Sequence, residues 1–511
     1  MSDKEVKITI EPDGKIIEAG RGETFRSALS RSGYFFPQNC GGKGQCGHCR
    51  IEFEDPQPKM LPREIELLGA ESTQRLACLR RVNQDTIIRL PAVLEWSGDK
   101  TITDFAVAGS NTAGYGIAVD LGTTLVALYL ADLSKGAIMA QTSFLNPQVH
   151  YGGDVMTRLE QAKSEDQRKI LTDIVHRALE ESINTLLVRT GVPGDKIRRT
   201  FISGNTAMTH LLLGRGGEGL ERAPFRSPLE GNGILNLDST RIGLDSDCLC
   251  EICPVIRGFI GGDTTAAIVA AGLDQNSGNR LLIDLGTNGE IVLSVGGKLW
   301  ATSTAAGPAF EGVGMHDGMP ALKGAIEGLS ETGEPFVIGG GEPLGFCGSG
   351  YISAMAYILK TRIMNPTGLL EKNAANERVW SPLQSSKSSP AVYQDDVRKF
   401  QLAKGAIAAG IEILRRAAGI KITDIDEIFV TGSFGNRIDP QATMEIGLIP
   451  SLPLDRVIFL DNAAGRGALF CLASEDYKAR AVQLQKDVNI INLGDHPDFQ
   501  DAYIANMSFP G

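Results

Sequence analysis

The sequence of 511 residues lacks any long apolar run. Its longest apolar stretches, such as residues 265–273, are too short and too often broken by glycine to span a bilayer. The start of the sequence also lacks the apolar core of a secretory signal. We therefore expect a cytoplasmic protein with no membrane partner.

Long blocks of lysine and arginine are missing as well, and the formal net charge is −11. Nucleic-acid binding needs a basic surface that neutralises phosphate, so we expect no nucleic-acid partner. Nine cysteines are too few for a disulfide scaffold in a chain of this length. Because four of the nine fall within residues 1–93, they favour metal ligation in a reducing compartment.

Those four cysteines form the most informative pattern of the sequence. Three lie in a glycine-rich loop, Cys40-Gly-Gly-Lys-Gly-Gln-Cys46-Gly-His-Cys49, and Cys78 follows. Four thiolates with nearly this spacing hold [2Fe–2S] clusters. Structural zinc also takes four cysteines, but usually as two C-x2-C pairs, and only Cys46 and Cys49 form such a pair here. The pattern favours a [2Fe–2S] cluster, with zinc as the alternative.

The residues around the cysteine loop predict one small domain. Alternating apolar residues predict strands at 6–10, 15–18, 50–54 and 85–90, and a short helix at 22–30. With the cysteine loop, this order resembles the β-grasp fold of [2Fe–2S] ferredoxins. The resemblance implies that the cluster ligands are Cys40, Cys46, Cys49 and Cys78. We place this domain at residues 1–93 and a polar, glycine-containing linker at 94–113.

Beyond the linker, the chain contains an internal repeat. Tyr115-Gly-Ile-Ala-Val-Asp120-Leu-Gly-Thr-Thr124 precedes one apolar strand, and Leu281-Leu-Ile-Asp284-Leu-Gly-Thr-Asn288 precedes another. Each copy predicts a strand, an Asp-Leu-Gly-Thr turn and a second strand. One such turn is a weak signal, whereas two favour a phosphate site between a pair of hairpins.

The residues of the two turns suit that chemistry. Glycine lets the backbone approach phosphate oxygens, hydroxyl and amide groups donate hydrogen bonds, and carboxylates hold Mg²⁺ through water. We expect Asp120 and Asp284 to be the catalytic carboxylates. The expected phosphate contacts are Gly122, Thr123, Thr124, Gly286, Thr287 and Asn288.

A third motif follows both turns, Glu427-Ile-Phe-Val-Thr-Gly432-Ser433-Phe434-Gly435. In this order the three motifs resemble the ATPase superfamily of actin, sugar kinases and heat-shock chaperones, abbreviated ASKHA. The resemblance implies a two-lobed α/β ATPase, with lobe 1 at residues 114–277 and lobe 2, with a C-terminal segment, at 278–511. It also implies an adenosine site at Gly432, Ser433, Phe434 and Gly435. An ordinary strand-to-helix turn is the alternative for these four residues.

The stretches between the motifs predict helices at 154–162, 167–190 and 397–418. Small residues in the last helix fit either close core packing or one flank of the adenine pocket. Cys248, Cys250 and Cys253 leave metal binding open but favour buried or free thiols, and Cys347 and Cys471 are expected to be structural.

A ferredoxin domain joined to an ASKHA ATPase resembles the reductive activators of corrinoid-dependent methyltransferases. The blocks that carry this resemblance are Asn146-Pro-Gln-Val-His-Tyr-Gly-Gly-Asp154-Val, Ser203-Gly-Asn-Thr-Ala-Met208, Gly261-Gly-Asp263, Ala305-Ala-Gly-Pro-Ala-Phe-Glu-Gly312 and Cys347-Gly-Ser-Gly350. The resemblance implies ATP-dependent transfer of one electron from the cluster to an inactive Co(II) corrinoid, giving Co(I). It implies a [2Fe–2S] cluster, ATP and Mg²⁺ as cofactors.

The same resemblance implies two partners, namely a corrinoid protein of a methyltransferase system and an upstream low-potential electron donor. Larger members of the family place an extra domain between the ferredoxin domain and the ATPase. Here roughly twenty residues separate the two, too few for a folded domain, and a homodimer is left open. Ser303, in Thr302-Ser-Thr304, could face the corrinoid, although plain turn chemistry is the favoured interpretation.

Two other functions use the same motifs. A small-molecule kinase with a redox-sensing ferredoxin domain would need the same ATPase loops and, in addition, a substrate pocket with a catalytic base. A nucleotide-responsive scaffold related to actin-like filaments would need neither. Phosphorylation of a metabolite would indicate the first, and the absence of cobalt reduction under any electron supply would indicate the second.

Overall fold

The computed structural model describes residues 6–11, 14–32, 44, 49–54, 56–90, 102, 114–312, 314–383, 389–432 and 438–511. The first of these segments form a five-stranded sheet with the order β2-β1-β5-β3-β4. Its strands are β1 (Val6–Glu11), β2 (Lys15–Ala19), β3 (Arg50–Phe53), β4 (Gln74–Leu76) and β5 (Thr86–Arg89). The helices of this domain are α1 (Phe25–Arg31) and α2 (Pro62–Leu68). The four predicted strands are confirmed.

The core of this domain lies between the sheet and α1, where Ile8, Leu29 and Ile88 are fully buried. Strand β1 pairs with β2 in the antiparallel sense and with β5 in the parallel sense. Helix α1 begins later than predicted because Thr24 caps it, with its hydroxyl accepting a 3.1 Å hydrogen bond from the Ser27 N–H. The result is the expected β-grasp arrangement.

Two six-stranded sheets form the rest of the molecule. The first has the order β10-β11-β9-β6-β7-β8, and the second has the order β21-β20-β12-β13-β14-β22. In each sheet a hairpin (β6–β7 or β12–β13) continues antiparallel to a third strand, β8 or β14. In each, two later strands add in parallel on the other side, β9 and β11 in the first and β20 and β21 in the second. This shared topology confirms the internal repeat.

The strands of the first sheet are β6 (Tyr115–Leu121), β7 (Leu125–Asp132), β8 (Ala137–Leu145), β9 (Ile197–Gly204), β10 (Leu235–Leu237) and β11 (Leu249–Ile252). Those of the second are β12 (Arg280–Leu285), β13 (Gly289–Val295), β14 (Lys298–Thr304), β20 (Glu427–Gly432), β21 (Val457–Phe459) and β22 (Val488–Ile490). Smaller sheets hold β15 (Ala325–Leu329), β16 (Pro335–Val337) and β17 (Gly345–Phe346), and β18 (Val379–Trp380) with β19 (Val392–Tyr393).

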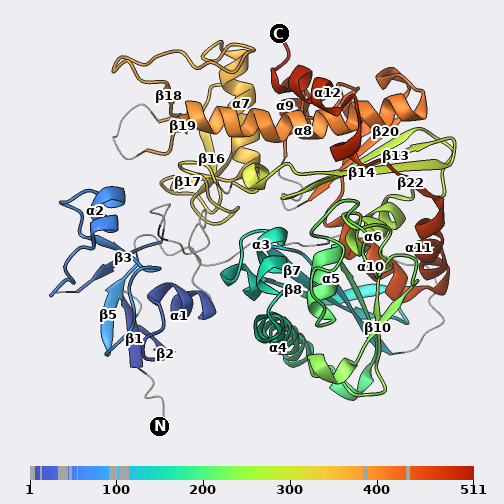
Figure 1. Cartoon of the computed structure of the whole chain (residues 1–511), viewed down its shortest axis with the longest axis horizontal. Coiled ribbons are helices and arrows are strands. Elements are labelled where there is room, and N and C mark those ends of the chain that lie inside the picture. The colour runs from blue at the N-terminus through green and yellow to red at the C-terminus, as the bar shows by residue number, and fades with distance from the viewer. Residues whose placement is uncertain are drawn as a thin grey trace.

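Helices cover both faces of both large sheets (Figure 1). The outer face of the first sheet packs against α3 (Val155–Gln161), α4 (Glu165–Thr190) and α5 (Thr206–Leu212). Helices α6 (Gly262–Ala271) and α10 (Ala463–Ala473) share the core between the two sheets. The outer face of the second sheet packs against α7 (Gly348–Lys360), α8 (Gln394–Ala418) and α9 (Pro440–Glu445). Helix α11 (Glu475–Asp487) contacts α6, and α12 (Phe499–Met507) lies along α8.

The three predicted helices are confirmed as α3, α4 and α8. Helix α8 begins earlier than predicted because the buried carboxylate of Asp396 accepts a 3.0 Å hydrogen bond from the Tyr393 N–H and so closes the first turn. Its small residues serve packing: a Cβ on Gly405 would lie 3.1 Å from Met507 of α12, and one on Gly410 would lie 2.6 Å from Ile291. At these two positions the core-packing interpretation holds.

The remaining cysteines are buried in the core. Cys248, Cys250, Cys253 and Cys471 are free thiols, and burial raises the pKa of each, that of Cys471 to about 12. Cys347 is buried, with its thiol donating to the Ile326 carbonyl at 3.3 Å. Within the predicted linker, Ile102 belongs to the described residues and is buried, and its N–H donates to the Gln141 side chain at 3.0 Å. None of the helices among the described residues is long and apolar enough to cross a membrane.

Candidate functional site

Two of the four predicted cluster ligands lie among the described residues. Cys49 directly precedes β3 and Cys78 follows β4, and the Ala77 N–H donates to the Cys49 carbonyl at 2.7 Å. The two thiols are adjacent, because a side-chain hydrogen bond from Cys49 is the main cause that lowers the pKa of Cys78 to about 7. Cys40 and Cys46 lie outside the described residues. The structure therefore brings one predicted ligand pair together.

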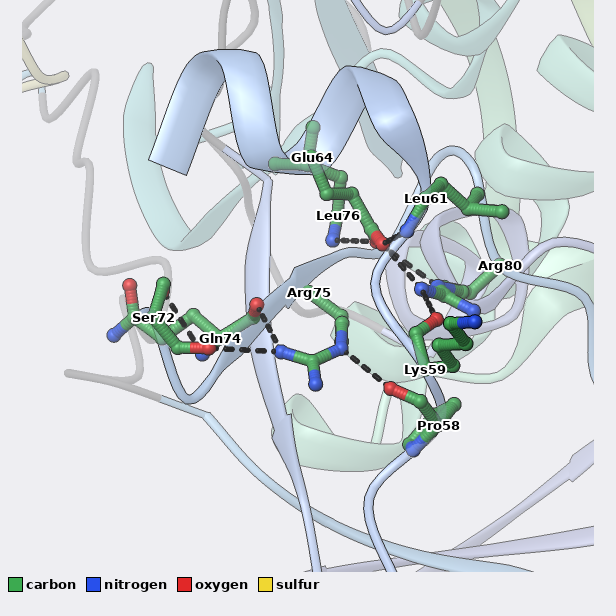
Figure 2. Close-up of polar contacts among 9 residues, drawn as sticks. All are labelled: Pro58, Lys59, Leu61, Glu64, Ser72, Gln74, Arg75, Leu76 and Arg80. Atoms are coloured by element: carbon green, nitrogen blue, oxygen red, sulfur yellow. Dashed lines mark hydrogen bonds and ion pairs between the residues drawn. The ribbon is translucent and has the colours of Figure 1, made fainter. Parts of the chain in front are cut away.

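A buried ion pair stabilises the segment that carries Cys78 (Figure 2). The Glu64 carboxylate, fully buried in α2, pairs with Arg80 and accepts hydrogen bonds from the N–H groups of Leu61 and Leu76, at 2.8 and 2.9 Å. Arg75 donates to the Pro58 carbonyl at 2.8 Å on the other side of the segment. These contacts fix the backbone on both sides of Cys78.

A cleft lies where the two repeated hairpins meet. The turns of β6–β7 and β12–β13 both reach it, together with the ends of β9 and β20 and the starts of α6 and α10. The residues that line it are Asp120, Gly122, Thr123, Thr124, Leu125, Val155, Asn205, Asp263, Asp284, Gly286, Thr287, Asn288, Glu290, Glu311, Thr431, Gly432, Asn462 and Ala464. Every predicted residue of the two turns is in this set.

Glu311 joins the two hairpins across the cleft. Its carboxylate accepts a hydrogen bond from the Thr287 hydroxyl at 2.9 Å and one from the Thr124 hydroxyl at 3.3 Å. Asn205 caps α5 and donates from its side chain to the Thr123 hydroxyl at 2.8 Å. The hydroxyls of Thr124 and Thr287, which were expected to donate to phosphate, thus already donate within the protein, whereas that of Thr123 accepts.

The carboxylates of the cleft are crowded. Asp120 is almost fully buried at the end of β6. Burial, followed by the charges of Asp263 and Asp284, holds the pKa of Glu290 well above its ordinary value, although the Ser303 hydroxyl donates to it at 3.1 Å. A proton or a cation is needed to keep such carboxylates close together. No group of three or more histidine, cysteine or acidic side chains forms a ready metal cage in the described part of the chain.

Ser303 and its neighbours belong to β14 and not to a turn, so the favoured turn interpretation of Thr302-Ser-Thr304 is wrong. Ser303 pairs with Glu290 across the hairpin, which directs its hydroxyl to the cleft. The Thr302 hydroxyl is buried and donates to the Ile491 carbonyl at 2.7 Å. The contact of Ser303 with a corrinoid stays a prediction.

The predicted adenosine motif begins at the cleft. Gly432 ends β20 with φ of +134°, and a Cβ there would lie 2.2 Å from the Leu285 carbonyl oxygen, so only glycine fits beside the second hairpin. Ser433, Phe434 and Gly435 lie outside the described residues. The cleft has a volume of about 90 Å³, well below the roughly 300–1,000 Å³ of most small-molecule sites.

Nine of the eighteen lining residues had no predicted role, and they include the acidic or amide side chains of Asn205, Asp263, Glu290 and Glu311. Asn205, Asp263 and Glu311 belong to sequence blocks that we used only for the family resemblance, and Glu290 lies two residues after the second repeat. A signal was present, because each is a polar residue within a glycine-rich block. Their convergence depends on the fold, however, since Glu311 contacts Thr124 across 187 positions of sequence.

Three family models match the chain. One described as "C-terminal domain of RACo the ASKHA domain" matches residues 278–511, one described as "RACo middle region" matches 115–276, and one for a 2Fe-2S iron-sulfur cluster binding domain matches 8–83. The corrinoid activation enzyme RamQ of Eubacterium limosum is 34% identical over 419 residues, which cover 77% of this chain and 70% of RamQ. The chain belongs to the RACo family.

Two further relatives of this RACo-family chain span most of its length. A [Co(II) methylated amine-specific corrinoid protein] reductase from Methanosarcina barkeri is 27% identical, covering 77% of each chain. The solved structure of a reductive activator for corrinoid, iron-sulfur protein has a TM-score of 0.69 at 23% identity, covering 99% of this chain and 98% of that one. The predicted family and the predicted fold class, a ferredoxin domain followed by an ASKHA-type domain, are confirmed.

The match to the middle region covers the segment that we predicted as the first ATPase lobe. The domain boundaries and the lack of an extra domain stay predictions. In space, α10 from the second lobe packs against β6 and β9 of the first. The two lobes are therefore joined by a helix that belongs to the second lobe in sequence.

Proposed function

We propose that this protein uses ATP to activate a corrinoid protein reductively, passing one electron to inactive Co(II) corrinoid to give Co(I). The observation that carries the proposal is the 34% identity to a corrinoid activation enzyme over 70% of its length, in a chain that joins a ferredoxin domain to a twin-hairpin cleft. The relative from Methanosarcina barkeri, named as a reductase of a Co(II) corrinoid protein, supports the same reaction.

The ferredoxin domain would hold the electron carrier. Cys49 and Cys78 are adjacent and fit a thiolate-bound cluster, and Cys40 and Cys46 complete the proposed ligand set. When bound, a [2Fe–2S] cluster supplies a one-electron carrier at about −400 mV. The buried Glu64–Arg80 pair keeps the Cys78 segment in place.

The cleft would bind Mg-ATP. Asp120 and Asp284, which line the cleft, would hold Mg²⁺ through water, and a cation between the hairpins would also relieve the repulsion around Glu290. Phosphate oxygens would take the hydroxyls of Thr124 and Thr287 in place of Glu311. Because the cleft is too small for a nucleotide, binding would separate the lobes, and hydrolysis would let them close again.

ATP is needed for an energetic reason. Reduction of Co(II) corrinoid by a plant-type cluster is uphill, and each deficit of about 59 mV costs a factor of ten in the equilibrium constant of a one-electron transfer. Binding the Co(II) partner lowers the barrier by changing cobalt ligation, and hydrolysis then releases the partner. ATP can shift the equilibrium between the open and the closed arrangement of the two lobes only by its difference in affinity for these two arrangements.

The experiment that tests the assignment compares stimulators of ATP hydrolysis. We expect a Co(II) corrinoid protein of a methyltransferase system to accelerate hydrolysis, with no phosphorylated metabolite formed. Hydrolysis that depends on a small metabolite and yields its phosphate ester would instead identify a kinase. Nucleotide binding with neither hydrolysis nor response to corrinoid protein would identify a scaffold.

A further inference from the structure

The ferredoxin domain contacts the first lobe through its helix α1. Helix α1 lies against η1 (Pro147–His150), the short 3₁₀ helix that follows β8 (Figure 1). Arg26 of α1 is a buried charged residue with 8% exposure. Its charge acts on His150 of η1, so the two residues lie close together across the contact. We call this the α1–η1 contact.

On the ferredoxin side, the contact is tied to the segment that carries Cys78. The Phe25 N–H donates to the Arg80 carbonyl at 3.0 Å, and the Arg26 N–H donates to the Ala77 carbonyl at 3.1 Å. The charge of Arg26 also reaches Cys78. A displacement of α1 therefore displaces the Cys78 segment.

On the other side, the contact is tied to the first phosphate hairpin. Asn146 caps η1, and its N–H donates to the Thr124 carbonyl at 2.8 Å. The Asn146 side chain donates to the Gly122 carbonyl at 2.9 Å. One residue thus joins η1 to both ends of the turn expected to hold phosphate.

Two arginines and a histidine come together at this place. His150 is half-buried with its Nδ1 atom buried and unpartnered, and desolvation, followed by the charges of Arg26 and Arg158, lowers its pKa to about 4. Arg158 of α3 is fully buried, and it donates from Nε to the Gly152 carbonyl at 2.8 Å while Nη2 has no partner. The acidic groups that act on Arg158 are Asp154 and Glu311. Two guanidinium groups therefore flank a neutral histidine.

We infer that the α1–η1 contact couples the nucleotide cleft to the ferredoxin domain, with Arg26 as the positioning residue, and that nucleotide strengthens the contact. Phosphate in the cleft adds negative charge beside Thr124, near the guanidinium groups of Arg26 and Arg158 that both act on His150, and so stabilises their approach. It also displaces Glu311 from Thr124 and Thr287, which leaves that carboxylate available to Nη2 of Arg158. The inference rests on the proposed binding of ATP.

Linkage makes the coupling reciprocal, so a change in the ferredoxin domain must alter nucleotide affinity. The test measures binding of Mg-AMPPNP to the full-length protein with its cluster bound. Arg26→Ala is expected to raise the Kd at least about fivefold, the lower end of common coupling factors, although Arg26 does not line the cleft. Arg26→Lys keeps the positive charge, so its Kd for Mg-AMPPNP should stay within about twofold of that of the unmodified protein.

The matched control is Arg89→Ala, an exposed arginine of β5 in the same domain, which should leave the Kd unchanged. Equal affinities of Arg26→Ala and the unmodified protein, or an equal loss in Arg89→Ala, would overturn the inference. Failure of the unmodified protein to bind Mg-AMPPNP would refute the proposed function instead.

A second measurement needs no variant. Hydrogen–deuterium exchange in the unmodified protein should slow in residues 25–31 and 77–82 when Mg-AMPPNP is added. Bound nucleotide without any change in these two segments would overturn the inference even if Arg26→Ala failed to fold.

Discussion

The acidic residues of the cleft form a cluster of neighbouring carboxylates. Asp120, Asp263, Asp284 and Glu290 meet where the two hairpins end, and burial together with neighbouring charge holds the pKa of Glu290 above its ordinary range. Such a cluster is costly unless a proton or a cation compensates it. Under the proposed function, a magnesium nucleotide would supply the cation and would use the hydroxyls of the same two turns.

Asp284 therefore provides a sharp test of the cleft. Asp284→Ala is expected to lower ATP turnover by about 10² or more, the usual cost of removing one preorganised electrostatic group, and to leave the visible spectrum of the cluster intact. Steady-state hydrolysis and absorption spectroscopy measure the two effects. Asp166→Ala, an exposed aspartate in the first turn of α4, is the control. Turnover of Asp284→Ala near that of the control would contradict the assignment.

Cys78 tests the other half of the molecule. Cys78→Ser is expected to lose most of the bound iron and the cluster absorption, because one of four thiolate ligands is replaced. Cys248→Ser is the matched control: Cys248 hydrogen-bonds to the Thr200 hydroxyl at 3.6 Å, a contact that serine can keep. Iron analysis after anaerobic reconstitution distinguishes the two variants. A complete cluster in Cys78→Ser would exclude Cys78 as a ligand.

Single residues were predictable where a pattern repeats. Asp120 and Asp284 stand at the same place in two copies of one motif, and both line the cleft. Glu311 has no such counterpart, and its contacts with Thr124 and Thr287 arise only when the lobes meet. Arg26 and His150 were also missed, because their relation depends on how two domains sit together.

At the scale of elements, α2 and β4 are held together by one carboxylate (Figure 2). Glu64→Gln removes a fully buried negative charge that pairs with Arg80. This loss should lower the free energy of unfolding of the ferredoxin domain by about 3 kcal/mol. Loss of cluster absorption during denaturation follows this domain alone. Glu66→Gln is the control, since its pair with Arg63 is exposed. Equal stability of the two variants would contradict this role.

The Glu64 carboxylate also makes the stability of the ferredoxin domain depend on pH, in a direction set by its lowered pKa. Burial alone raises the pKa of Glu64, but hydrogen bonds from Arg80 and the N–H groups of Leu61 and Leu76 outweigh it, so the pKa lies below the ordinary 4.5. A lowered pKa contributes stability that is complete above pH 4.5 and is lost as pH falls through the folded value. Denaturation curves at decreasing pH should show the Glu64→Gln deficit shrinking. A constant deficit would contradict the charge argument.

Periodicity predicted helices α1, α3, α4 and α8 and the strands beside the motifs, because their apolar residues recur at helical or strand spacing. The errors have local causes. Thr24 and Asp396 cap α1 and α8 and shift their first residues. Thr302-Ser-Thr304 has the composition of a turn, yet it continues β14 because Thr302 is buried and bonds to Ile491, far along the chain.

At the scale of the whole molecule, two sheets of one topology enclose α6 and α10, with the cleft at their shared end (Figure 1). The repeat in sequence predicted two equivalent lobes. It could not predict that α10, which follows β21 of the second sheet, packs on β6 and β9 of the first. This packing of α10 joins the two lobes. In the proposed function, opening of the cleft would therefore move each lobe as a unit about α6 and α10.

The ferredoxin domain sits beside the first lobe and contacts the segment between β8 and α3 (Figure 1). The segment of the proposed ligand Cys78 is thereby connected through α1 and η1 to the first Asp-Leu-Gly-Thr turn. This arrangement gives a physical reason for joining the two domains in one chain: the state of the cleft can alter the position of the electron donor.

The central claim is that ATP drives reduction of corrinoid cobalt. The direct measurement mixes reduced protein anaerobically with a Co(II) corrinoid protein of a methyltransferase system and follows the absorption band of Co(I). We expect the band to form with Mg-ATP and to be nearly absent without it. Equal Co(I) with and without Mg-ATP, or no Co(I) with any cognate corrinoid protein, would contradict the claim.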